Sequence, residues 1–275
     1  MEDPFGYCEH LVRGADKDRF LATLFAPAHC RGALAALYAF NIEIARIREV
    51  IRDPMAGEIR LQWWRQALGD SGSGEAMASP VASALLDTIA RFDLPVAPLV
   101  AMIEARAFDL YNDPMPTLAA LEGYATATSS ALIDLAARIL GGPATDVASV
   151  VREAGQAYAV TALLRAFPRH ASRGQLYLPL EVLERHGARP EDVFAGRTTA
   201  PLLAGLAELR AIAERHLEAF GKAAIPPAVA PAFLPVALVR LYLRALERFR
   251  LQPFHLVEVP QWRRQWVLWR AARRM

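Results

Sequence analysis

The sequence predicts a single all-α domain, a helical bundle with a central cavity, and three observations support this. Apolar residues recur at the three- and four-residue spacing of amphipathic helices along most of the 275 residues. Alternating runs of β-branched residues, which indicate strands, are scarce. We find neither an internal repeat nor a linker long enough to separate two domains, so residues 1–275 are treated as one unit.

The predicted helices are separated by clusters of proline, glycine and serine, which end helices and form turns. The first runs from Asp18 to Phe25 and is closed by Pro27. The second is long, from Arg31 to Arg52, and Asp53-Pro54 ends it. Each later helix has an apolar stripe on one face, and these helices are Gly57–Leu68, Val81–Arg91, Pro95–Tyr111, Thr117–Leu140, Asp146–Phe167, Pro201–Ala219 and Phe233–Phe249.

The composition narrows the classes of function. The chain is 54% hydrophobic and 22% charged with a formal net charge of +2, so its overall charge does not indicate nucleic-acid binding. The basic residues are nearly all arginine. A GC-rich genome would give that bias, and so would a need to bind anionic groups with planar guanidinium forks.

Cellular location is predicted from what the sequence lacks. Cys8 and Cys30 have no metal-ligand spacing and are interpreted as buried free thiols of a reducing compartment. No basic-then-apolar leader precedes Asp3-Pro4, and nowhere do about 18 apolar residues run without a charge. We therefore expect a cytoplasmic protein, with peripheral contact with the inner membrane left open.

The last segment, residues 260–275, is predicted to be a basic, tryptophan-rich C-terminal helix. Trp262, Trp266 and Trp269 are spaced as one helical stripe, and arginines flank it. This pattern is typical of a helix lying on an anionic membrane or docking on a partner. The alternative is a terminal helix that packs on the domain by its Trp stripe and leaves its arginines in solvent.

Several segments together resemble squalene and phytoene synthases over roughly residues 5–255. In that family a short helix ends at a proline, an arginine follows, and a Tyr-Ala-Phe-Cys-Arg run leads into an Asp-Asp-x-x-Asp cluster. A second motif places an Arg-Asp pair and another aspartate before a Gly-Arg-x-Tyr-Leu-Pro stretch. The matching segments here are Asp18–Pro27, Arg31, Leu37–Phe40, Leu118–Gly142, Gly155–Arg165, Arg173-Gly174 and Tyr177–Pro179.

The resemblance implies an isoprenoid synthase-like fold and a known chemistry. Such synthases join two prenyl diphosphates head to head in terpenoid biosynthesis, with Mg²⁺ held by aspartates of two facing helices. This sequence departs from the family at those positions, which are occupied by Ala45, Arg46 and Glu49 in the first motif and by Ala166 and His170 in the second. Only one of five carboxylates remains, as Glu49, and a cation at Arg46 would repel Mg²⁺.

Loss of those carboxylates predicts a protein without catalytic residues, bound metal or other cofactor. Each contact to transition-state charge contributes roughly 3–4 kcal/mol, so two losses slow the reaction by about four to six orders of magnitude. Pro168 is also expected to end the second motif's helix early. The alternative is a prenyltransferase with a remodelled site, and only that alternative requires Mg²⁺. A metal site rebuilt from Glu49 and His170 is disfavoured for want of a third ligand.

A branch of this family shares the departures. Phe5-x-Tyr7-Cys8, Leu24–Pro27, Ala39–Glu43 and Arg60-x-Gln62-Trp63-Trp64 resemble the branch that contains the mitochondrial complex I assembly factor. That resemblance implies a non-catalytic assembly or scaffolding factor whose partner is a complex I subunit or an assembly intermediate. Trp63 and Trp64 could line a prenyl channel, although tryptophan beside Leu61 and Leu68 is more often core.

A second hypothesis concerns a ligand. Side chains near the lost aspartates are expected to bind a prenyl diphosphate or phospholipid without metal, since arginine contacts phosphate bidentately. The alternative is that Glu43 with Arg46, and Glu49 with Arg52, form ordinary surface pairs. The expected ligand-binding residues are Tyr38, Asn41, Arg48, Glu49, Arg52, Arg165, Arg169, Arg173 and Tyr177.

Overall fold

The computed structural model describes residues 3–51, 53–69, 78–141 and 148–274, and these residues form helices and no strand. The all-α prediction is therefore confirmed. The helices are α1 (Pro4–Ala15), α2 (Lys17–Thr23), α3 (Ala28–Ala45), α4 (Ile47–Val50), α5 (Pro54–Gly69), α7 (Pro80–Phe92), α8 (Val96–Leu110), α9 (Leu118–Ala125), η1 (Thr126–Ser130), α10 (Ala131–Ile139), α11 (Ala148–Ser172), α12 (Leu180–His186), α13 (Pro190–Phe194), α14 (Ala200–Gly221), η2 (Pro227–Val229), α15 (Ala230–Phe233), η3 (Leu234–Leu238), α16 (Val239–Arg248) and α17 (Gln261–Ala272).

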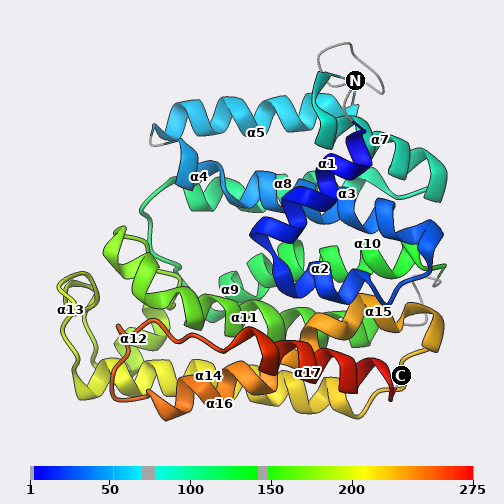
Figure 1. Ribbon diagram of the computed structural model, residues 1–275. Helices are drawn as coiled ribbons and strands as arrows, with labels where there is room; N and C mark the ends of the chain where they lie inside the picture. Colours follow the sequence, from blue (N-terminus) through cyan, green and yellow to red (C-terminus); the bar gives the residue numbers. More distant parts are fainter. Residues whose placement is uncertain (1–2, 52, 70–77, 142–147, 275) are drawn as a thin grey trace.

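The helices are stacked in layers (Figure 1). Helices α5 and α7 cover one side, α14, α16 and α17 cover the opposite side, and α3, α8, α10 and α11 fill the middle. The long helix α11 packs against α14, η1 and α16, while α3 packs against α1 and α7. One extensive apolar core runs through the layers, because buried leucines and alanines line the facing stripes.

Helix α1 and the short helices α12 and α13 were missed in the sequence. A local signal for α1 is present, since the Asp3 carboxylate accepts a hydrogen bond from the Phe5 amide (3.1 Å) and Pro4 occupies the first turn. Helix α1 packs on α3 and α7 and buries Cys8. Cys8 and Cys30 are both free and buried, as expected, and burial raises the pKa of the Cys8 thiol to about 12.

The predicted helix from Arg31 to Arg52 is broken in two. It begins earlier, at Ala28 directly after Pro27, and α3 ends at Ala45. Arg46 forms the junction to the single turn α4, and Ile51 is already extended. The break falls within the first motif, with Ala45 at the end of α3 and Glu49 on α4.

The expectation that Pro168 ends its helix early is wrong. Helix α11 runs through Pro168 to Ser172. Proline removes one backbone donor, but the last turn is held otherwise, because Ala171 is buried and the Gln175 amide donates to the His170 carbonyl (2.9 Å). Gly174 permits this ending, since its φ of +72° is the left-handed conformation in which helices commonly close.

The predicted helix Thr117–Leu140 is continuous but contains a π-helical segment, η1. Helix α11 crosses it very closely, because a Cβ atom on Gly155 would lie 2.5 Å from the Ser130 Cα atom. The Gln156 side-chain amide links the two helices beside this crossing by donating to the Glu122 carbonyl (2.8 Å) and the Thr126 hydroxyl (2.9 Å). Only glycine fits at position 155, so this crossing depends on one residue.

Among the described residues, one helical stretch, Pro227–Arg248, has the length and apolarity needed to cross a membrane. The most apolar part of this stretch is 61% buried inside the domain. The stretch comprises η2, α15, η3 and α16 rather than the single helix expected from Phe233, because prolines such as Pro235 interrupt it. It packs against α10, α11 and α14 as part of the interior.

Candidate functional site

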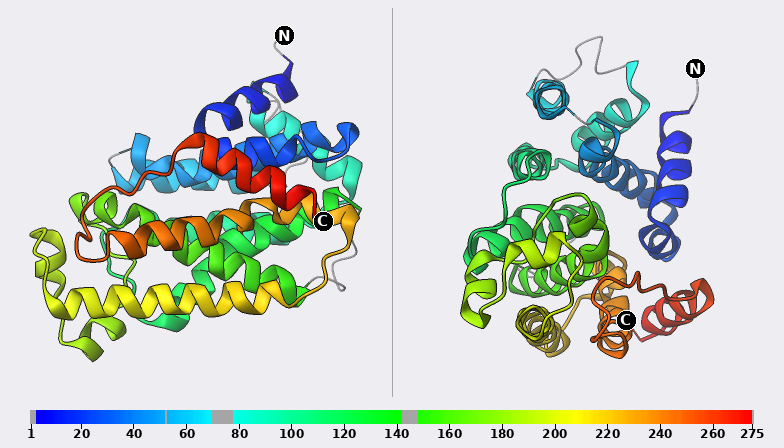
Figure 2. Two further views of the ribbon diagram at one scale, coloured as in Figure 1. Left: turned by 60° about the horizontal axis from the view of Figure 1, so that its bottom comes forward. Right: turned by 90° about the vertical axis from the view of Figure 1, so that its left-hand side faces the viewer.

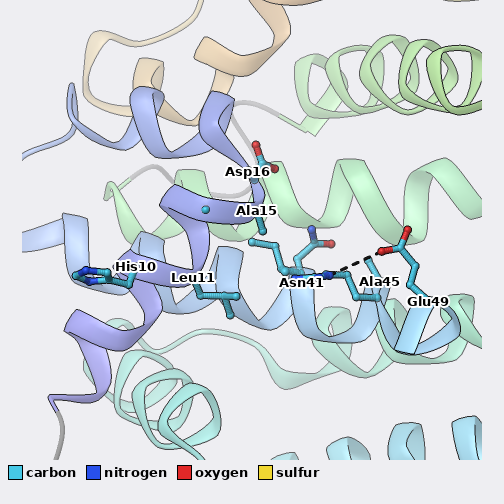
Figure 3. Close-up of a pocket in the computed structure, with 10 residues that line it drawn as sticks. His10, Leu11, Ala15, Asp16, Asn41, Ala45 and Glu49 are labelled. Carbon is cyan, nitrogen blue, oxygen red and sulfur yellow. Dashed lines mark ion pairs between the residues drawn. The ribbon is translucent and has the colours of Figure 1, made fainter. Parts of the chain in front are cut away.

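An open cavity of about 600 Å³ lies between α1 and the first motif (Figure 3). One wall comes from α1 and the turn before α2, and the other from the end of α3 together with α4. The two walls meet where the family places its first aspartate cluster, so this cavity is the candidate site. Its lining residues are His10, Leu11, Gly14, Ala15, Asp16, Asn41, Ile42, Ala45, Arg46 and Glu49.

The three former aspartate positions of the first motif all line this cavity. Ala45 offers a methyl group, and Arg46 and Glu49 form an ion pair across one turn (3.8 Å). Both side chains are substantially exposed, at 51% and 37%. The predicted pair of Glu43 with Arg46 is wrong, since Glu43 pairs with Arg60 on α5 (3.3 Å). Arg52, the other expected partner, lies outside the described residues.

The two motifs are joined by an ion pair. Arg173, just beyond the end of α11, donates to the Glu49 carboxylate on α4 (3.0 Å), 124 residues away in sequence. The surviving acidic residue of the first motif is thus shared between two arginines. Two positive charges face one negative charge, which leaves this exposed cluster with a net charge of +1. A carboxylate held in this way is a poor ligand for a divalent cation.

His170 takes the position of an aspartate in the second motif and lies against the core. Its ring packs on the Tyr177 ring with centroids 4.5 Å apart. Burial lowers the pKa of His170 to about 4, although the Asp109 carboxylate acts in the opposite direction, and Arg169 and Arg173 lower it further. The imidazole is therefore neutral near pH 7. In the part of the chain that the structure describes, no three His, Cys, Asp or Glu side chains gather as a metal site.

A buried polar network beneath His170 was missed in the sequence. The Asp109 carboxylate on α8 accepts hydrogen bonds from the hydroxyls of Tyr177 (2.6 Å) and Tyr124 (2.9 and 3.0 Å). Arg106, one turn earlier, donates to Asp109 (3.1 Å) and to the Tyr124 hydroxyl (2.5 Å). Tyr177, an expected ligand residue, is thereby committed to this network, and burial raises its pKa well above the ordinary value.

A second polar network lies between α2, α11 and the C-terminal helices. Asp18 accepts hydrogen bonds from the Tyr242 hydroxyl and from Arg264 on α17 (2.6 Å). Arg165, expected to bind ligand, has its guanidinium over the Tyr242 ring, 3.5 Å from the centroid. Its charge is therefore directed onto an aromatic face.

The remaining expected ligand residues divide between wall, core and rim. Asn41 lines the cavity, whereas Tyr38 is only 3% exposed and lies beneath the Arg19 guanidinium. Arg48 donates to the Asn112 side chain (3.3 Å). Arg169 is exposed. Asn41 and Glu49 thus line the cavity, with Arg173 paired to Glu49, whereas Tyr38, Arg165 and Tyr177 make internal contacts.

Two apolar features bear on the expected cavity. Trp64 is fully buried with its ring edge-on to Phe40 (5.0 Å), so the interpretation of Trp64 as core is confirmed. The space between α9, α11 and α14 that borders His170 and Tyr177 measures only about 10 Å³. Leucines and Phe167 fill it, and that volume is below the size of a prenyl chain.

The family model described as squalene/phytoene synthase matches residues 12–270 of this chain. Among curated proteins, the NADH dehydrogenase (ubiquinone) complex I assembly factor 6 of Rattus norvegicus is 29% identical over 258 residues, covering 93% of this chain and 77% of that protein. The Homo sapiens protein of the same description is 28% identical over 252 residues, with coverages of 90% and 75%. The 15-cis-phytoene synthase of Synechocystis is 27% identical over 211 residues, with coverages of 71% and 61%.

Solved structures with the same fold are also similar to this chain. A dehydrosqualene synthase in complex with ligand superposes with a TM-score of 0.83 at 21% identity, covering 98% of this chain and 96% of that one. A squalene synthase from Alicyclobacillus acidocaldarius superposes with a TM-score of 0.75 at 24% identity, with coverages of 91% and 95%. At these identities the likeness concerns the fold, which is the isoprenoid synthase-like bundle that the sequence predicted.

Proposed function

The chain belongs to the squalene/phytoene synthase family, and on that premise we propose that it is a non-catalytic member acting as an assembly or scaffolding factor for a respiratory NADH dehydrogenase, complex I. The observation that carries the proposal is the Arg46–Glu49–Arg173 cluster, which occupies the place where family chemistry requires carboxylates around Mg²⁺. Support also comes from the relatives described as complex I assembly factor 6. The partner is a complex I subunit or an assembly intermediate.

Electrostatics argue against prenyl coupling at this site. Ionisation of an allylic diphosphate requires positive charge brought by metal ions to the leaving group. Here Glu49 is neutralised by two arginines, and Ala45 and Ala166 supply no oxygen ligand. Arginines could bind a diphosphate, but they do not replace the fixed octahedral geometry of Mg²⁺. A remodelled prenyltransferase remains the alternative that the experiment below must eliminate.

The same cluster supports binding of a phosphate group. Arg46 borders the cavity, and Arg173, just beyond the end of α11, reaches Glu49, so both guanidinium groups converge on one exposed carboxylate. We propose that the phosphate of a prenyl diphosphate or a phospholipid binds there without metal, competing with Glu49 for the two arginines. We place the protein in the cytoplasm at the inner membrane, where complex I is assembled.

One experiment separates the factor from the enzyme. The gene is deleted in the organism that encodes it, and complex I is measured by native gel and by NADH:quinone activity of the membranes. The factor predicts loss of assembled complex I, and the purified protein then releases no diphosphate from farnesyl or geranylgeranyl diphosphate with Mg²⁺. Normal complex I in the deletion strain would refute the factor, and Mg²⁺-dependent diphosphate release would establish the enzyme.

Ligand binding has its own measurement. Geranylgeranyl diphosphate is titrated calorimetrically into the protein in EDTA, and we expect binding that is lost in the R46Q/R173Q double variant. The matched control is R185Q/R197Q, which removes two exposed arginines that also form ion pairs, far from the cavity. Absence of heat with the unmodified protein, or equal loss in the control, would contradict metal-free phosphate binding.

A further inference from the structure

The tryptophan stripe of α17 faces away from the domain. Trp262, Trp266 and Trp269, called the Trp face below, are 63%, 57% and 41% exposed. Figure 2 shows α17 at the outer edge of the bundle. The alternative in which this helix packs on the domain by its tryptophans is therefore wrong, and the stripe is available to an external surface.

The opposite side of α17 anchors the helix. Leu268 is 1% exposed and packs in a small cluster with Ala22, Leu234, Leu238 and Tyr242. Arg264, on the same side, is paired with the buried carboxylate of Asp18 (2.6 Å). The helix is thus fixed with its Trp face outward, since both an apolar contact and an ion pair set its rotation.

The Trp face is arranged as a platform. Trp266 and Trp269 stack with ring centroids 5.0 Å apart and planes 27° apart. The Arg263 guanidinium lies over Trp262 (5.1 Å) and that of Arg273 over Trp269 (4.8 Å). With Gln265, the three indoles border an open hollow of about 480 Å³. Rings held in this way present a continuous apolar surface whose edges carry cations.

The charge around the Trp face has one sign. From Gln261 to Arg274 the chain contains five arginines and no acidic residue. Arg264 is paired with Asp18, and in the part of the chain that the structure describes none of the other four forms an ion pair. These four arginines, Arg263, Arg270, Arg273 and Arg274, are all exposed.

From this arrangement we propose that the Trp face binds the surface of an anionic lipid bilayer. Indole rings are favoured at the boundary between headgroups and acyl chains, and arginines beside them bind anionic headgroups. The helix lies in the plane of the headgroups with its Trp face inserted, while Leu268 and Arg264 hold the domain behind it. A surface of this charge suits phosphates of a bilayer better than a second copy of this chain, whose own Trp face is equally positive. The inference stands whether or not the proposed function holds.

The test is flotation of the full-length protein with vesicles. Two compositions are compared, pure phosphatidylcholine and phosphatidylcholine in which roughly a third is replaced by phosphatidylglycerol. We expect flotation with the anionic vesicles only. The variant W262A/W266A/W269A should bind at least about a hundredfold more weakly, and R263Q/R270Q about tenfold to thirtyfold more weakly, at roughly fivefold per arginine.

Matched controls distinguish binding by the Trp face from nonspecific binding by other exposed apolar or basic residues. Replacing Val50, Met55 and Ile59 by serine removes an equally exposed apolar set elsewhere, and R240Q/R244Q removes two other exposed arginines. Both should float as the unmodified protein does. All altered side chains are exposed, so far-ultraviolet circular dichroism should be unchanged in each variant.

Tryptophan fluorescence gives an independent measurement. The only other tryptophans are Trp63 and Trp64 in α5, so a blue shift on adding anionic vesicles reports the Trp face. We expect that shift in the unmodified protein and none in the triple Trp variant. The proposal is overturned if the protein floats with neither vesicle composition, or if the triple Trp variant floats as well as the unmodified protein does.

Discussion

Two carboxylates, those of Asp109 and Glu49, act to raise the pKa of His170. They differ in burial and in the groups that pair with them. Asp109 is 7% exposed, and its oxygens accept from two tyrosine hydroxyls and Arg106. The Glu49 side chain is 37% exposed and is shared by Arg46 and Arg173 across solvent. Asp109 is satisfied entirely from within the fold, whereas Glu49 bridges two helices at an open cavity.

This difference in burial predicts that one carboxylate matters for stability and the other for ligand binding. A buried carboxylate with a full set of donors is fixed, and removing it leaves Arg106 without a counter-ion in the interior. An exposed carboxylate held by two arginines is weakly coupled to folding, because water screens the interaction. We therefore expect the fold to depend on Asp109, and we expect Glu49 to be the group with which an incoming anion competes. Three predictions test this contrast, from the largest expected effect to the smallest.

The largest effect is expected at Asp109. Its replacement by asparagine should lower the free energy of unfolding by about 3 kcal/mol or more, because the buried Arg106 loses its carboxylate partner. Urea denaturation followed by circular dichroism measures it. The matched control is D134N, since Asp134 pairs with Arg138 (2.8 Å) in a more exposed position and should lose less than about 1 kcal/mol. Equal losses in the two variants would contradict a special role for the buried network.

The second prediction concerns His170 and pH. Its pKa is about 4 in the folded protein and about 6.5 in the unfolded chain. Between these values the unfolded chain binds a proton that the folded protein does not, so stability should fall as pH decreases from about 6.5 to 4 and change no further below. The loss from this residue amounts to roughly 3 kcal/mol.

The variant H170F isolates that contribution, because phenylalanine preserves a ring beside Tyr177 but does not titrate. Denaturation midpoints at several pH values between about 4 and 7.5 give the slope for each protein. We expect the unmodified protein to lose more stability on acidification than H170F does. Parallel curves would show that the imidazole is not held neutral by burial.

The fold was predictable because helical periodicity is local, whereas the site depends on contacts between distant segments. Leu61 and Trp64 were assigned to one face from spacing alone, and both are fully buried. The spacing of Trp262, Trp266 and Trp269 predicted one stripe but not its direction. Val267, Leu268 and Ala271 make the opposite side of α17 apolar as well, so only the Asp18–Arg264 pair and the packing of Leu268 decide it.

The site was predicted only in part, because sequence motifs locate single positions but not the contacts between distant segments. The replaced aspartates were located from the family motifs, and Glu49 with Arg173 do meet at the cavity. Asp109 had no neighbouring signal, since its tyrosine partners lie 15 and 68 residues away. The signal available was that Tyr124 and Tyr177 both belong to segments that match the family. The helix end predicted at Pro168 was wrong because the contacts that hold the last turn of α11 come from residues beyond Pro168.

The smallest effect on stability and the sharpest on function are expected at Glu49. E49Q should change the free energy of unfolding by less than about 1 kcal/mol, because both ion pairs are solvent-exposed. The substitution leaves Arg46 and Arg173 without an opposing charge, so the affinity for geranylgeranyl diphosphate in EDTA should rise roughly threefold or more. Millimolar Mg²⁺ should not raise that affinity. A catalytic metal site predicts that Mg²⁺ raises the affinity and that E49Q lowers it, because the carboxylate would be a metal ligand. Calorimetry with and without Mg²⁺ decides between them, and weaker binding by E49Q in Mg²⁺ would show that Glu49 holds a cation.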